Sequence, residues 1–138
     1  MDWKICAADD LRRYRLMKIG ILNSRDKLRA IEHKKTGTRT RLTQRTTRSD
    51  PQVLDAIVEA ERIKTNIAAA ERITKLIERG LESLNDEERK ILELLYLNDE
   101  PNMRKLRDEL GYAPRSLYRL RDRALKNFTL AMYGVENL

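Results

Sequence analysis

The sequence predicts an all-α protein, with a long helical hairpin or coiled coil followed by a domain of three to four short helices. Three observations support this prediction. The 138 residues include only five glycines and three prolines, so turns are few. Charged residues make up 37% and apolar residues 41%, which suits helices with one apolar stripe better than a thick core. Apolar residues also recur every three or four positions, the period of a helix.

The first element is an N-terminal helix within residues 1–33. From Asp10 onwards the spacing alternates between four and three, which gathers one stripe: Tyr14, Met17, Ile21, Ser24, Leu28 and Ile31. Trp3 and Cys6 are expected to pack at the start of this helix, and His33 is expected at its exposed end.

A basic segment at 34–49 separates this helix from the next. It contains six bases and no acid, and it is rich in threonine without an apolar period, which is typical of a linker. Two interpretations stay open, a solvated loop and an arm that lies along phosphates with salt-sensitive, sequence-independent affinity. The bases are Lys34, Lys35, Arg39, Arg41, Arg45 and Arg48.

A second long helix is expected over residues 50–84, with Asp50 as its N-cap and Pro51 in its first position. Two series repeat every seven residues and interleave into one seam: Val53, Ala60, Ile67, Thr74 and Leu81, with Ala56, Ile63, Ala70, Ile77 and Leu84. One helix cannot bury its own seam, so a partner helix is required. The N-terminal helix of the same chain and a second copy, which would give a homodimer, are both candidates.

The C-terminal domain, residues 85–138, begins with a helix that should run to Leu97. Asn85 is expected to cap the amide of Glu88, whose carboxylate should reach back to the amide of Asn85 as in a capping box. Residues 98–101 end this helix, and Asn102 is expected to cap a short helix over 103–110. That helix should turn three residues inward, Met103, Leu106 and Leu110.

Gly111 follows where a positive φ is easiest, and Pro114 then starts another helix. Four apolar residues form its inner stripe, Leu117, Leu120, Ala124 and Phe128. Roughly opposite them lie Arg115, Arg119, Asp122 and Lys126. A short helix, a turn with glycine and a second helix with a basic outer face are typical of a helix-turn-helix.

This arrangement predicts double-stranded DNA as the partner. The first turns of such a helix enter the major groove, where arginine binds guanine O6 and N7 in a bidentate pair. The predicted base-reading residues are Arg115, Ser116, Tyr118 and Arg119. The predicted phosphate contacts are Arg104, Lys105, Arg107, Arg123 and Lys126.

Other classes of protein have little support in the composition. One cysteine and one histidine supply neither an internal disulfide nor a zinc site, so no metal or cofactor is expected. The carboxylates fall at helix caps and solvent faces and do not pair in a predicted pocket, so an enzyme is not expected. No apolar run approaches a membrane span of roughly 18 residues, and the N-terminus is unlike a signal peptide. We therefore expect a cytoplasmic protein with no membrane partner.

Several positions between 84 and 128 carry a resemblance: Leu84, Glu88, Arg89, Ile91, Leu92, Tyr96, Leu106, Leu110, Gly111, Tyr112, Ser116, Leu117, Tyr118, Arg119, Leu120, Ala124 and Leu125. This segment is similar to the promoter-reading C-terminal domain of bacterial sigma factors. With the preceding heptad helix and the ending Ala131-Met132-Tyr133-Gly134, the chain resembles small phage transcriptional regulators of the ArpU/RinA kind.

The resemblance implies a regulator of phage late genes, such as packaging and lysis genes, that binds promoter DNA in the cytoplasm of the bacterial host. Sigma domains place a Ser or Thr cap and an Arg at the start of the recognition helix, where this chain has Ala113 and Pro114. Only Arg115, Tyr118 and Arg119 therefore carry over as DNA-contacting positions.

Two alternatives use the same features differently. One is a DNA-recognition assembly protein of phage packaging, similar to a small terminase, which would form a large oligomer. The other is a protein-only adaptor that binds RNA polymerase through the acidic segment 85–100. Charge favours DNA, because residues 101–128 carry eight bases and three acids, +5, of the total net charge of +7.

Overall fold

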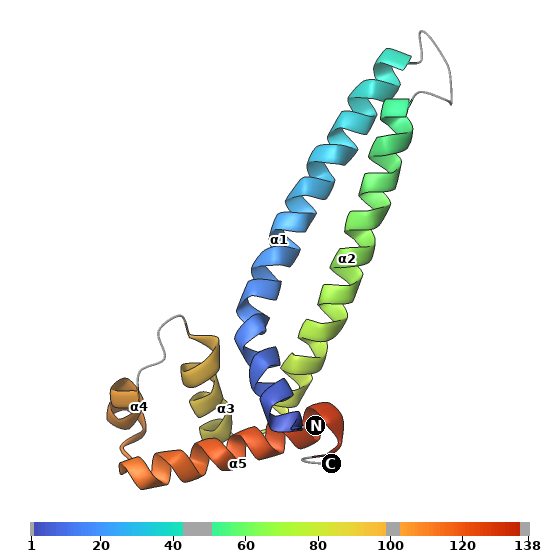
Figure 1. The fold of residues 1–138 in the computed structure, drawn as a ribbon. Coiled ribbons are helices and arrows are strands. Elements are labelled where there is room, and N and C mark those ends of the chain that lie inside the picture. The colour runs from blue at the N-terminus through green and yellow to red at the C-terminus, as the bar shows by residue number, and fades with distance from the viewer. Residues whose placement is uncertain (1, 43–50, 99–102, 136–138) are drawn as a thin grey trace. The chain divides into compact units, whose positions relative to one another are not determined.

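A computed structural model describes residues 2–42, 51–98 and 103–135 (Figure 1). Its elements in chain order are α1 (Trp3–Leu42), α2 (Pro51–Glu82), α3 (Asp86–Leu92), the π-helical turn η1 (Glu93–Leu97), α4 (Met103–Leu110) and α5 (Pro114–Tyr133). All secondary structure in these ranges is helical, so the all-α prediction is confirmed. Among these helices none is long and apolar enough to cross a membrane.

The end of α1 differs from the expectation for residues 34–49. The linker prediction is wrong for residues 34–42, which continue α1 as helix. Extending an existing helix needs no new nucleus, and each Thr or Gly costs only about 0.5–1 kcal/mol relative to Ala. The arm residues Lys34, Lys35, Arg39 and Arg41 therefore lie on a helix. Two further arm residues, Arg45 and Arg48, and the predicted cap Asp50 fall outside the described residues.

The chain divides into two compact units that do not follow the predicted domain boundaries. Unit 1 comprises residues 1–16 and 73–138, and unit 2 comprises residues 17–72. The start of α1 and the end of α2 thus belong to the same unit as α3, α4 and α5. Three short helices alone carry few apolar side chains, and very small domains bury too little surface to be stable by themselves.

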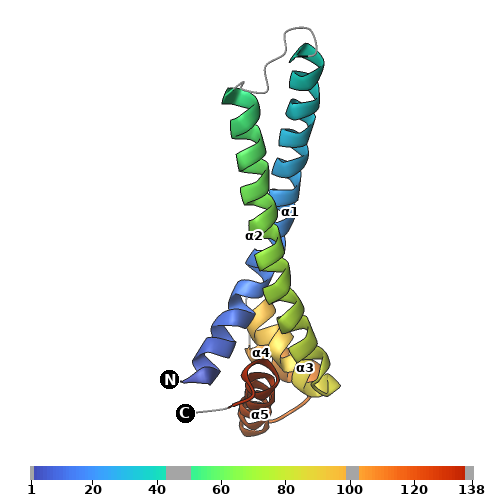
Figure 2. The ribbon, with the colours of Figure 1, turned by 90° about the vertical axis from the view of Figure 1, so that its right-hand side faces the viewer.

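Unit 2 is an antiparallel pair formed by α1 and α2 of the same chain (Figures 1 and 2). Ile21 and Ala60 are buried, and the other predicted seam residues of this unit are half-buried. Arg25 pairs with Glu71, and Lys64 Nζ lies 3.9 Å from Glu32. The seam residues of this unit therefore lie between two helices of one chain, and most of them stay partly exposed.

In unit 1, α5 packs its predicted apolar stripe inward. Leu117, Ala124 and Phe128 are fully buried and Leu120 is nearly so. Phe128 lies against Gly80 of α2, where an added Cβ would stand only 2.9 Å from the ring carbon Cε2. Because any other side chain would occupy this space, Gly80 allows the close approach of α2 and α5.

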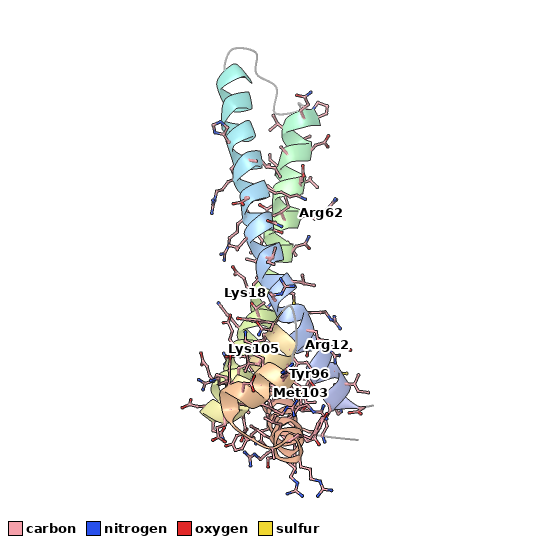
Figure 3. The ribbon with its side chains drawn as sticks, turned by 90° about the vertical axis from the view of Figure 1, so that its left-hand side faces the viewer. Arg12, Lys18, Arg62, Tyr96, Met103 and Lys105 are labelled. Atoms are coloured by element: carbon pink, nitrogen blue, oxygen red, sulfur yellow. The ribbon has the colours of Figure 1, made fainter. Side chains whose placement is uncertain are left out.

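The start of α1 is tied to unit 1 by aromatic side chains. The rings of Trp3 and Tyr133 lie 4.9 Å apart, and the Tyr133 hydroxyl donates to Asp10. The guanidinium of Arg12 lies 5.3 Å from the ring centre of Tyr96 in η1 (Figure 3). These contacts, with the buried Ala7, Ala8 and Leu11, show why residues 1–16 group with the C-terminal helices.

The junction between α2 and α3 depends on Arg89. Its Nε donates to the carbonyl of Leu81 at 3.2 Å, and its Nη2 donates to the carbonyls of Glu82 at 3.4 Å and Leu84 at 3.2 Å. These carbonyls lie at or just beyond the end of α2 at Glu82, and that of Leu81 also accepts from the N–H of Leu84 at 3.1 Å. A basic side chain thus caps the C-terminus of α2, where the helix dipole favours positive charge.

The helix expected to run to Leu97 changes at Glu93 from α to π geometry. Residues 94–97 are Leu, Leu, Tyr and Leu, and all four are half-buried. An α-helix turns about 100° per residue, so one α-helical face could not hold four consecutive side chains. The wider π-helical turn therefore occurs where the side chains of residues 94–97 are all half-buried.

We predict that Gly80→Ala destabilises unit 1. The new Cβ would overpack the buried Phe128 ring, and overpacking costs about 1–3 kcal/mol, partly offset by the roughly 1 kcal/mol that alanine gains over glycine in a helix. Urea unfolding followed by the fluorescence of Trp3 measures this change. As a control, Gly20→Ala in α1 meets no atom within 4 Å and should raise helix stability. Equal effects of the two substitutions would contradict the proposed packing.

A second prediction concerns stability at high pH. Burial and the hydrogen bond that Tyr14 donates to Glu78 at 2.7 Å raise the pKa of Tyr14 to about 12. The folded state favours the neutral phenol. Its contribution to the free energy of unfolding is therefore complete below the unfolded pKa of about 10 and is lost as pH rises through about 12. Between these values Tyr14→Phe should lose less stability than the wild type in urea unfolding. Parallel pH profiles would refute this role for Tyr14.

Candidate nucleic-acid interface

The segment predicted to be a helix-turn-helix contains α4, the three residues 111–113 and α5. Leu106 of α4 is buried, and Met103 and Leu110 are half-buried, as their spacing predicts. Gly111 has the expected positive φ of 69°, and its N–H donates to the carbonyl of Arg107 at 2.8 Å. Pro114 then occupies the start of α5 without a side-chain cap from Ala113. Local chemistry therefore sets the turn that leads into α5.

The outer face of α5 carries the predicted base-reading residues. Arg115, Ser116, Tyr118 and Arg119 are all exposed, while the neighbouring Leu117 is fully buried. Arg115 and Arg119 are four residues apart and therefore stand one turn apart on the same face. This face begins within the first turns of α5, the part of a recognition helix that contacts base edges.

Tyr118 is not an isolated aromatic residue. The guanidinium of Arg121 lies 5.1 Å from its ring centre, and Nη2 of Arg121 lies 3.2 Å from Asp122 Oδ1. Arg121 thereby joins the ring to a carboxylate on the outer face of α5. Sequence reasoning assigned no role to Arg121, because its helical position is close to the inner stripe.

A hollow of about 260 Å³ opens beside this face. It is lined by Glu87, Tyr112, Ser116, Arg119, Leu120 and Arg123. The Tyr112 hydroxyl donates to Glu87 at 2.7 Å and so joins the turn before α5 to the first turn of α3. This hydrogen bond raises the pKa of the Tyr112 phenol above its ordinary value. Two arginines, two hydroxyls and one carboxylate thus line this surface hollow.

Glu88 is the buried anchor between α3 and α5. Its backbone N–H donates to Asn85 Oδ1 at 2.8 Å, which confirms Asn85 as the cap. Its carboxylate, however, accepts from the side-chain amide of Asn85 at 2.8 Å and from that of Asn127 at 3.0 Å. The expected return bond to the Asn85 backbone amide is thus replaced by side-chain bonds. Arg123 Nε lies 3.5 Å from the same carboxylate.

The predicted phosphate contacts lie on two helices of unit 1. Arg104, Lys105 and Arg107 are exposed on α4, and Arg123 and Lys126 are exposed on α5. Arg123 also faces Glu88, so it combines an internal ion pair with an exposed side chain. The structure thus leaves all five of these bases accessible to solvent.

The acidic segment 85–100 is used mainly inside unit 1. Glu87 bonds to Tyr112, Glu88 is buried, and Asp86 lies 3.8 Å from Arg89. Glu93 lines a hollow of about 230 Å³ with Tyr14, Leu81, Leu97, Glu78, Glu82 and Arg89. Asp99 and Glu100 fall outside the described residues. Most described carboxylates of this segment therefore have partners within the unit.

Two residues of the site could not have been assigned from sequence alone. Asn127 bonds to Glu88 across 39 positions, and Arg89 caps a helix that ends seven residues earlier. The Asn85–Glu88 pattern did indicate a helix start, but capping by itself does not identify a third partner.

Within the described ranges, no group of three or more His, Cys, Asp and Glu side chains is placed to hold a metal ion. No protein-family model matches this chain, and comparisons with curated proteins and with solved structures found no match. The arguments below therefore rest on the residues and their geometry.

We predict that Glu88→Ala destabilises unit 1 by about 1–3 kcal/mol, because it removes a buried carboxylate and leaves the part-buried amides of Asn85 and Asn127 without their acceptor. Urea unfolding measures the loss. Asp86→Ala is the matched control, because Asp86 lies two residues earlier in α3, is fully exposed and forms only a surface ion pair. A Glu88 variant as stable as the control would show that this carboxylate is not an anchor.

Proposed function

We propose that this protein is a transcriptional regulator that binds specific sequences of double-stranded DNA through α4 and α5. In this proposal α5 is the recognition helix, with Arg115, Ser116, Tyr118 and Arg119 at base edges. The protein acts by binding rather than by catalysis and requires no metal or cofactor. Its resemblance to the ArpU/RinA kind supports phage late genes as the target and the bacterial cytoplasm as the location.

The observation that carries this proposal is the contrast between the two faces of α5. The inner face is buried along its whole apolar stripe, and the outer face presents Arg115 and Arg119 one turn apart after the Gly111 turn. A helix held firmly on one side can present donors to guanine in a fixed geometry.

The remaining bases support an electrostatic contribution to binding. Exposed lysines and arginines on α4 and on the later turns of α5 suit phosphate oxygens, which set register without reading sequence. Each phosphate that is neutralised releases counterions, so affinity should fall steeply with salt. The helical part of the basic segment, Lys34, Lys35, Arg39 and Arg41, is a further candidate for such contacts.

The adaptor alternative is less well supported. Binding of RNA polymerase through segment 85–100 would use the exposed Asp86, Glu87 and Glu93, but Glu87 already accepts a hydrogen bond within unit 1 and Glu88 is buried. The packaging alternative uses the same DNA-binding face and differs in assembly. Exposed apolar side chains on the outer faces of unit 2 favour self-association, which either DNA-binding function could use.

Selection from a random DNA library with the purified full chain tests the proposal. We expect one enriched motif, and we expect Arg119→Ala to reduce the preference for that motif over a mismatch by about 5- to 150-fold, the effect of about 1–3 kcal/mol from a bidentate pair. Lys105→Ala should instead weaken binding to all sequences and reduce the salt slope by about one.

Arg62→Ala is the control for these variants, since Arg62 is an exposed arginine of unit 2 outside α4 and α5. It should leave the motif unchanged. Failure to enrich any motif would refute sequence-specific binding. An oligomer of eight or more copies that binds the DNA would favour the packaging alternative.

A further inference from the structure

Unit 2 has two exposed apolar surfaces besides its seam. On α1, Ile19 and Leu22 are 42% and 60% exposed, and on α2, Leu54 and Val58 are 48% and 56% exposed. At about 100° per residue, each pair lies on the side of its helix away from the seam. Both helices of the pair therefore turn apolar side chains outward, in opposite directions.

The two surfaces differ in charge. The α1 surface, which we define as Lys18, Ile19, Leu22 and Arg29, carries two bases, and Asp26, which lies 3.3 Å from Arg29, leaves it with one net positive charge. The α2 surface, defined as Leu54, Asp55, Val58 and Glu59, carries two acids, and the neighbouring Arg62 leaves it with one net negative charge.

The α2 surface is also hollowed. A depression of about 310 Å³ is lined by Asp55, Val58, Glu59 and Arg62, and Figure 3 marks Arg62 on α2. An apolar side chain with a neighbouring base fits such a depression, because it would cover Val58 and bring a cation to the two carboxylates.

We propose that unit 2 binds a second copy of this chain head to tail, with the α1 surface of one copy on the α2 surface of the next. Apolar burial supplies the attraction, and the opposite charges set the pairing. A contact between two α2 surfaces would bring together two surfaces of net negative charge, and a contact between two α1 surfaces would bring together two of net positive charge. The charge pattern therefore favours the unlike pairing over a symmetric dimer.

A head-to-tail contact has a further consequence. Each copy that joins leaves one unfilled surface of each kind at the ends of the assembly, so the contact repeats until a ring closes or a filament grows. This interface does not involve α4 or α5. The inference is therefore independent of DNA binding, and it is tested without DNA.

Sedimentation of the full chain is the first measurement, and it should show concentration-dependent assembly. A variant with Asp55→Lys and Glu59→Lys should associate at least about tenfold more weakly, because both surfaces are then basic. A variant with Lys18→Glu and Arg29→Glu should be weakened similarly. When the two variants are mixed, each surface again meets an opposite charge, and assembly should return with the two chains alternating.

Controls separate this interface from loss of folding. Circular dichroism should show wild-type helicity in both variants, and Lys27→Glu, on another exposed face of α1, should not alter assembly. Leu22→Gln should weaken assembly without affecting the fold, because Leu22 is largely exposed. A monomeric wild type, or variants whose assembly is not restored by mixing, would overturn the proposal. A symmetric α2 dimer would instead persist in the Lys18 and Arg29 variant.

Discussion

The orientation of the outer face of α5 depends on how its inner face packs against the other helices of unit 1. Phe128 lies against Gly80 of α2, and Glu88 of α3 accepts a hydrogen bond from Asn127. One contact is apolar and the other is polar, and they join α5 to two different helices. Together they restrict both the depth and the rotation of α5. The direction in which Arg115 and Arg119 point follows from these contacts.

The acidic and basic side chains of unit 1 differ in their contacts as well as in their charge. Acids of α3 and α2 bond to partners within the unit, as Glu87 does with Tyr112 and Glu78 with Tyr14. Most bases of α4 and α5 remain exposed. These two helices themselves carry eight bases and three acids, so their field is positive, which suits an anionic partner. The net charge of the chain alone does not reveal this division.

Much of the fold could be predicted because its causes are local. Pro114, Gly111 and the period of Leu106 and Leu117 set the bounds of α4 and α5 through backbone preference and side-chain spacing. The composition of residues 34–42 led to a wrong prediction. Their threonines and glycine are typical of a loop, but α1 extends through them. The π-helical turn at Glu93–Leu97 was also missed, because a run of apolar residues has the same appearance in an α-helix.

For the candidate site, too, the local features could be predicted from the sequence and the long-range contacts could not. By itself the sequence determined the all-α class, the apolar stripe of each long helix and the basic outer face of α5, because helical periodicity needs only neighbouring residues. Only the tertiary structure decided that α1 packs on the seam of α2 and that Trp3 and Gly80 belong to the unit of α5. The same holds for Glu88, which anchors Asn127. These pairings join residues far apart in the chain, and several surfaces of similar chemistry compete for each of them, so their choice depends on the shape of the whole unit.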